Sequence, residues 1–145
     1  MKLIFLFIGV LLTACGTGPI QSHGGPVKDQ VSLIDTLRKD VTVDIVSSVT
    51  QPFLHPASGT AVRLSGGSLA TPADVQFFEY GSPDAAGSDV KAIRHDGSGT
   101  ATTSVDWVAP PHFFLKGRVL AIYVGSDPAA VSLLAGAMGP QFAGR

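Results

Sequence analysis

A tryptophan, a histidine and a carboxylate lie close together in one segment, Asp106–Phe114. Its two adjacent prolines fix local backbone angles and remove two backbone donors, so they are expected to break a strand and stiffen a loop. Stiff loops that expose aromatic side chains make good binding surfaces. Trp107, His112 and Phe113 are therefore a candidate binding edge.

The same side chains also suit a structural role. Apolar or small residues alternate with polar ones over 100–108, which predicts a strand with one buried face. That face carries Ala101, Thr103, Val105 and Trp107, and the alternation favours burial of Trp107. In this interpretation Phe113 is a core residue and His112 a hydrogen-bonded loop residue.

Three histidines, His55, His95 and His112, could act together with Asp96. Imidazole and carboxylate are good ligands for zinc and other divalent ions. None of the histidines has the spacing of H-x-x-x-H, so a metal site would need separate loops to converge. This is the basis of one alternative, a small envelope hydrolase or metal-dependent enzyme that uses loop histidines.

Other chemical motifs are weak. A serine hydrolase of the α/β type would need G-x-S-x-G at a sharp turn, and Gly97-Ser98-Gly99 is too short a likeness, so it is interpreted as a turn. Glu79 and Arg118 are charges in predicted strands, for which pairing or a solvent-facing position is the favoured interpretation. The sequence therefore predicts no catalytic residue, no metal and no cofactor, and the expectation is that the protein is not an enzyme.

The elements that would position these residues follow from periodicity. Apolar spacings of three and four predict helices at about 27–38, from Pro83 to about 93, and from Pro128 to about 138. Asp127 is the expected N-cap of the last helix, which should stop at Gly139. Strands are predicted at about 41–49, 60–65, 75–80, 100–108 and 119–124, the last apolar on both faces and so in the middle of the sheet.

The resulting order, α-β-β-β-α-β-β-α, predicts a single α+β domain with a mostly antiparallel sheet and helices packed on one face. Of the 145 residues, 45% are hydrophobic and 14% charged, which suits one packed core. The net charge is −1, and the basic residues are scattered, so no nucleic-acid partner is expected. We expect a monomeric domain.

The N-terminus carries an export pattern. Met1-Lys2 is a short positive start, and the apolar run 3–12 has the length of a signal-peptide core and is too short to span a membrane. The run ends in Leu12-Thr13-Ala14-Cys15, which resembles the bacterial lipobox. The resemblance implies a signal peptide over 1–14, cleavage between Ala14 and Cys15, and a diacylglycerol thioether with further acylation such as palmitate on Cys15.

Lipid on Cys15 would make membrane lipid the first partner of the protein. Two or three acyl chains hold a protein on a bilayer, whereas one is marginal. Residues 15–26 are rich in glycine, proline and small polar residues, which predicts a flexible tether. The protein should therefore be lipid-anchored outside the cytoplasm. In a Gram-negative host, Gly16 in place of aspartate predicts the outer membrane, facing the periplasm.

Residues 27–145 carry several distinctive motifs. They are Val75–Tyr80, Val105–Phe114, Gly117–Gly125 and Gly139–Gly144, together with Gln51-Pro52-Phe53 and Asp96-Gly97-Ser98. With these motifs, residues 30–144 resemble a family of small bacterial exported proteins and lipoproteins of uncharacterised activity. The resemblance implies export and a single domain, and it assigns no ligand or catalytic residue. The function expected from the sequence is thus a non-enzymatic module that binds an envelope protein or a cell-wall component.

Overall fold

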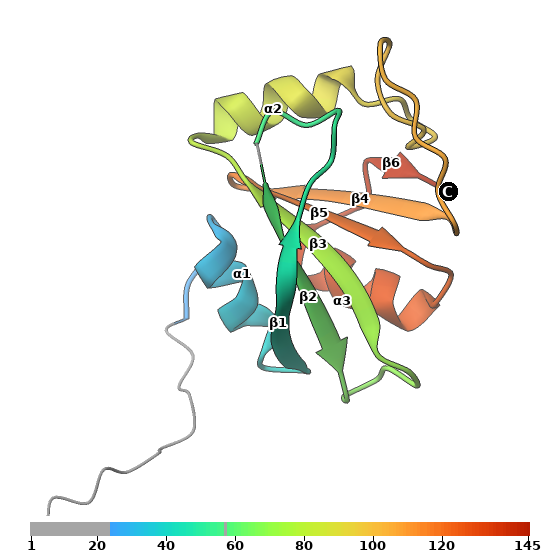
Figure 1. The fold of residues 1–145 in the computed structure, drawn as a ribbon. Coiled ribbons are helices and arrows are strands. Elements are labelled where there is room, and N and C mark those ends of the chain that lie inside the picture. Colours follow the sequence, from blue (N-terminus) through green and yellow to red (C-terminus); the bar gives the residue numbers. More distant parts are fainter. Residues whose placement is uncertain (1–23, 57) are drawn as a thin grey trace, which may run out of the picture.

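The structure is a computed structural model that describes residues 24–56 and 58–145. Within these residues three helices and six strands form one α+β domain, as predicted (Figure 1). The sheet order is β1-β2-β3-β5-β4-β6, and every neighbouring pair is antiparallel. The elements are α1 (Gln30–Leu37), β1 (Thr42–Val49), β2 (Gly59–Ser65), β3 (Ala73–Glu79), α2 (Pro83–Ala92), β4 (Pro111–Lys116), β5 (Val119–Val124), α3 (Pro128–Met138) and β6 (Ala143–Gly144).

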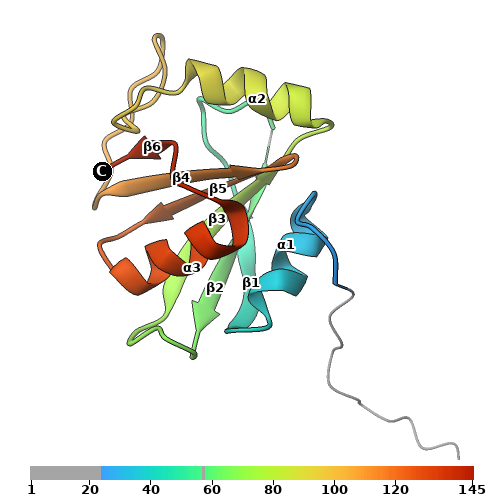
Figure 2. The ribbon, with the colours of Figure 1, turned by 180° about the vertical axis from the view of Figure 1, so that it is seen from behind.

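Each face of the sheet has its own hydrophobic cluster, because successive strand residues point to opposite faces. The first contains Val75, Phe77 and Phe114 and is covered by α1 and α3, which lie over the sheet in Figure 2. The second contains Phe78 and Phe113 and is covered by α2 and by loops. The placement of all helices on one face is thus wrong for α2. The reason is that β5 is apolar on both sides, so both faces need a cover.

The predicted strand over 100–108 is also wrong. This segment forms a turn closed by a bridge between Gly99 and Ser104, followed by irregular backbone. The paired prolines, which were expected to break a strand, instead precede and begin one, since β4 starts at Pro111. A proline is tolerated at the first position of a strand, where its missing N–H is least costly.

Strand β1 lies at one edge of the sheet. Val43 is buried, but Ile45, on the same face, and Val46 are 65% and 53% exposed, so burial along β1 ends after Val43. The register also shifts between Ile45 and Ser47, where an extra residue reverses the alternation of faces beyond Ile45. In the described part of the chain, no helix combines the length and the apolar character that crossing a membrane would require.

Candidate functional site

The residues of the predicted export signal lie outside the part of the chain that the structure describes. Ala14 and Cys15 lie outside the described ranges 24–56 and 58–145, as does most of the predicted tether. Cleavage and lipid attachment therefore remain predictions from the sequence.

Trp107 is half-buried at the end of the sheet where the loops after α2 gather. Its ring meets Phe53 and Phe113 edge to face, with centroids 6.2 and 6.0 Å away. Its indole N–H donates to the carbonyl of Gly97 over 2.7 Å. The ring is thus held by two neighbours and one hydrogen bond, while part of it still reaches solvent.

Gly97 is required for this arrangement. Its φ of +74° is a left-handed conformation, and a Cβ there would lie 2.7 Å from the Phe113 ring. The turn is stabilised by Asp96, whose Oδ1 accepts from the backbone N–H of Ser98 over 2.9 Å. Hydrogen bonds from the Ser98 backbone and side chain lower the pKa of Asp96. The predicted turn at Asp96-Gly97-Ser98-Gly99 is therefore confirmed.

A groove of about 330 Å³ opens beside Trp107. Its walls combine the indole with two prolines and with charged groups of both signs. Its lining includes Asp96, Asp106, Trp107, Pro110, Pro111 and Arg145. We call this the Trp107 groove.

His112 does not share the Trp107 groove. It lies on the α3 side of the sheet, stacked on Tyr123 with ring centroids 5.7 Å apart, whereas Phe113 points to the other face. Its Nδ1 lies 2.7 Å from Oε1 of Gln141 and its Nε2 lies 2.9 Å from the carbonyl of Gly125. His112 is only 8% exposed and both ring nitrogens have partners. The predicted edge of Trp107, His112 and Phe113 is therefore divided between two faces, with Phe113 fully buried.

The three histidines also lie apart. His55 contacts α2 through Asp89, His112 lies on the opposite face of the sheet, and the exposed His95 bonds β6 through its carbonyl, which accepts from Gly144 N–H over 2.8 Å. In ranges 24–56 and 58–145 no three histidine, cysteine or acidic residues gather in a way that could hold a metal. The convergence that the loop-histidine hypothesis requires is not found there.

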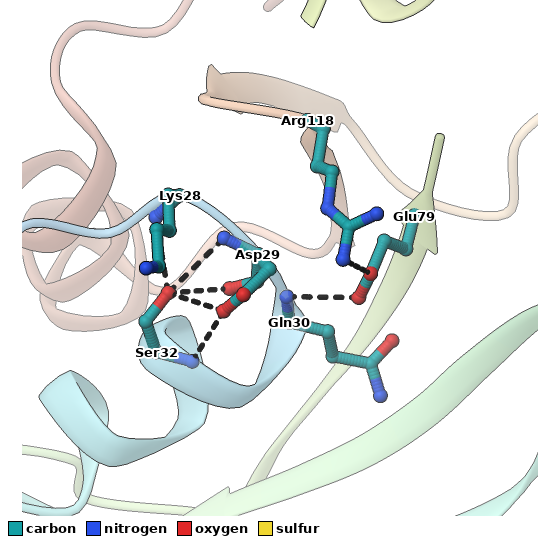
Figure 3. Close-up of polar contacts among 6 residues, drawn as sticks. All are labelled: Lys28, Asp29, Gln30, Ser32, Glu79 and Arg118. Carbon is teal, nitrogen blue, oxygen red and sulfur yellow. Dashed lines mark hydrogen bonds and ion pairs between the residues drawn. The ribbon is translucent and has the colours of Figure 1, made fainter. Parts of the chain in front are cut away.

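Glu79 and Arg118 are paired (Figure 3). Arg118 Nη2 lies 2.5 Å from Glu79 Oε1. The other carboxylate oxygen accepts from the backbone N–H of Gln30 over 3.0 Å, at the first turn of α1. An anion is favourable there because the first N–H groups of a helix have no partner within the helix. The pair therefore has a structural role, which is the favoured interpretation of the sequence.

A capping box completes the same helix end (Figure 3). The Asp29 side chain accepts from the Ser32 N–H over 2.9 Å, and the Ser32 hydroxyl accepts from the Asp29 N–H over 3.0 Å. Hydrogen bonds from Ser32 lower the pKa of Asp29. With Glu79, these contacts connect α1 to the sheet.

Glu79→Gln is expected to lower the free energy of unfolding by about 1 kcal/mol, because it removes the charge at a helix N-terminus and the ion pair but keeps the side-chain size. Urea denaturation checks this. Asp74→Asn is the matched control, since Asp74 lies on the same strand and pairs with Arg63 at the surface, without a helix contact. Equal effects of the two substitutions would contradict the role given to Glu79.

One buried polar side chain with three hydrogen-bonding contacts was missed by the sequence interpretation. Asp89, on α2, is 3% exposed. Its Oδ2 accepts from the Tyr80 hydroxyl and from the His55 backbone N–H, each over 2.8 Å, and its Oδ1 contacts His55 Nδ1. Burial, and then the hydrogen bond to Asp89, raise the pKa of Tyr80, so this phenol stays a donor.

A signal for Asp89 was present in the sequence. In the predicted helix from Pro83 to about 93, Ala86, Val90 and Ile93 form the apolar face, and position 89 lies on the same face, three residues after Ala86. A carboxylate at such a position is costly to bury unless donors surround it. Its presence therefore indicated a polar partner in the core.

A second groove, of about 560 Å³, lies over Asp89. It is lined by the loop before β2, by α2 and by the bridged turn, and it shares no lining residue with the Trp107 groove. Its lining includes Phe53, Leu54, His55, Lys91 and Thr100–Thr103. We call it the His55 groove.

No protein-family model, curated protein or solved structure matches this chain.

Proposed function

We propose that this protein is a lipid-anchored component of the bacterial cell envelope, held outside the cytoplasm through Cys15. The support comes from the sequence, where the single cysteine follows a signal-type apolar run in a lipobox pattern. In a Gram-negative host the expected place is the outer membrane, facing the periplasm. The domain acts there as a binding module for an envelope protein or a cell-wall component.

The observation that supports binding is the Trp107 groove. Its indole N–H is already bonded to Gly97, so the exposed part of the ring offers an apolar surface to a partner. Neighbouring prolines and ring contacts hold that surface in one orientation, which reduces the entropy lost on binding. Tryptophan and arginine are also the residue types that most often carry binding energy at interfaces.

Asp106→Arg and Trp107→Ala are each expected to weaken partner capture in the native host, the second by about 2 kcal/mol or more. Trp107→Ala removes the apolar surface, and Asp106→Arg reverses a charge at the groove without touching the core. Crosslinking in cells, followed by identification of the captured molecules, measures the effect. Val108→Ala is the control, because Val108 is fully exposed and lies outside the groove lining.

Two results would count against this function. One is capture of the same molecules, in the same amounts, by both groove variants. The other is loss of capture by Val108→Ala as well, which would show that the partner does not use the groove specifically. Circular dichroism of each variant verifies that the fold is intact.

A further inference from the structure

We infer that His55 and Asp89 form a general-base site in the His55 groove, suited to hydrolysis of small neutral carboxylic esters by water. This activity goes beyond the proposed binding function and does not depend on it. It gives a specific form to the hydrolase alternative that the sequence leaves open, with one histidine in place of three.

The contact with Asp89 determines the orientation of the His55 imidazole. A carboxylate is an acceptor only, so His55 Nδ1 must carry a hydrogen to bond Asp89 Oδ1. In the neutral ring the lone pair is then on Nε2. This is the arrangement by which a buried aspartate prepares a histidine to accept a proton from a nucleophile.

The side chains of Asp89 and His55 differ strongly in burial. The Asp89 side chain is 2% exposed and that of His55 is 88% exposed. Asp89 is held by Tyr80 and by the His55 backbone, so it cannot turn away from the ring. Asp89, which positions the ring, is thus fixed in the core, whereas His55, which accepts the proton, is exposed in the groove.

The His55 groove also offers an apolar wall and polar donors. Its volume of about 560 Å³ is that of a small-molecule site. Phe53 and Leu54 form an apolar part of the groove wall. In the part of the chain that the structure describes, the Lys91 ammonium and the Thr102 hydroxyl have no ion-pair or hydrogen-bonding partner. Both are donors that could stabilise an oxyanion.

With these groups, ester hydrolysis by water would proceed in two stages. A water oxygen adds to the ester carbonyl carbon, its proton passes to His55 Nε2, and the carbonyl π electrons move to oxygen as an oxyanion near Lys91 and Thr102. The oxyanion then re-forms the carbonyl, the bond to the alcohol oxygen breaks, and that oxygen takes the proton from Nε2. The products are a carboxylic acid and an alcohol, with His55 neutral again.

The charge of the groove favours esters over phosphorylated substrates. Lys91 is the single lysine or arginine in its lining, which also includes the carboxyl group of Asp89. Phosphoryl transfer uses several cationic groups or metal ions to hold the phosphate oxygens. A neutral ester needs donors only where its single oxyanion develops.

The test uses the full-length chain with 4-nitrophenyl acetate and 4-nitrophenyl butyrate over a range of pH. We expect saturable hydrolysis that His55→Gln lowers at least a hundredfold, the lower end of what a positioned base contributes. Asp89→Asn should lower kcat more than it changes KM, because it disturbs the tautomer of the base. His95→Gln is the matched control and should leave the rate unchanged, since His95 is exposed and lies outside this groove.

The alternative is that the pair only fastens the 51–56 loop to α2. Nitrogen NMR of His55 and circular dichroism separate the two roles. Hydrolysis no faster than that of equimolar free imidazole, an equal loss in His95→Gln, or a His55 tautomer with its hydrogen on Nε2 would each overturn the inference. Failure of the Trp107 capture experiment would leave these results unaffected, because the two grooves share no lining residue.

Discussion

Phe113→Ala is expected to lower the free energy of unfolding by about 3–5 kcal/mol. The Phe113 side chain is fully buried. Its ring meets those of Phe53, Trp107 and Phe142, with centroids 6.3, 6.0 and 6.0 Å away. Truncation removes these contacts and leaves a cavity that β4, held between β5 and β6, cannot collapse to fill.

Urea denaturation followed by circular dichroism measures this loss. Val108→Ala is the control, since Val108 is 100% exposed and should change the stability by less than about 0.5 kcal/mol. If Phe113→Ala cost less than about 1 kcal/mol, Phe113 would lie on a solvent-facing edge, as the binding-edge interpretation of the sequence supposes. The result therefore decides between the two roles considered for this segment.

Cys15→Ser is expected to abolish lipid attachment and cleavage at Ala14. The thioether to diacylglycerol needs the cysteine sulfur, and no other cysteine is present to replace it. Each buried CH₂ of an acyl chain contributes about 0.8 kcal/mol to membrane binding, so the loss of two or three chains should release the domain or leave an uncleaved precursor. This is the largest change in localisation that a single substitution in the chain should cause.

Labelling of cells with a clickable fatty acid, followed by membrane fractionation, checks the Cys15 prediction. Thr17→Ser is a suitable control, because it is an equally small change at a position two residues after Cys15. A Cys15→Ser protein that still incorporates the label would show that lipid is attached elsewhere. The lipid-anchor proposal would then be wrong, while the proposals for the two grooves would remain open.

Some of this fold could be predicted because it depends on interactions close in sequence. Asp127, Pro128 and Gly139 mark the two ends of α3 as predicted, since a helix cap is made by residues within one turn of the end. The central place of β5 also follows from its composition. A strand that is apolar on both sides is stable only where both of its faces are covered.

Residues 100–108 show where the local pattern was insufficient. Alternation made the segment suitable for a strand, but a strand also needs a neighbour with free backbone groups. β4 is bonded to β5 along its length and to β6 at His112 and Phe113, so the start of β4, the part nearest in the chain to residues 100–108, already has a partner on each side. The segment instead turns over the aromatic cluster and carries Trp107 to the end of the sheet.

The α+β class, the order α-β-β-β-α-β-β-α and most helix ends could be predicted from the sequence, because periodicity, caps and composition are local properties. Contacts between segments far apart in the chain place Trp107 and His112 on different faces and bring Asp89 to His55 and Tyr80. His55 is 34 residues before Asp89 in the chain. Their contact depends on α2 packing against the second face of the sheet, and that face was available because β5 buries both of its sides.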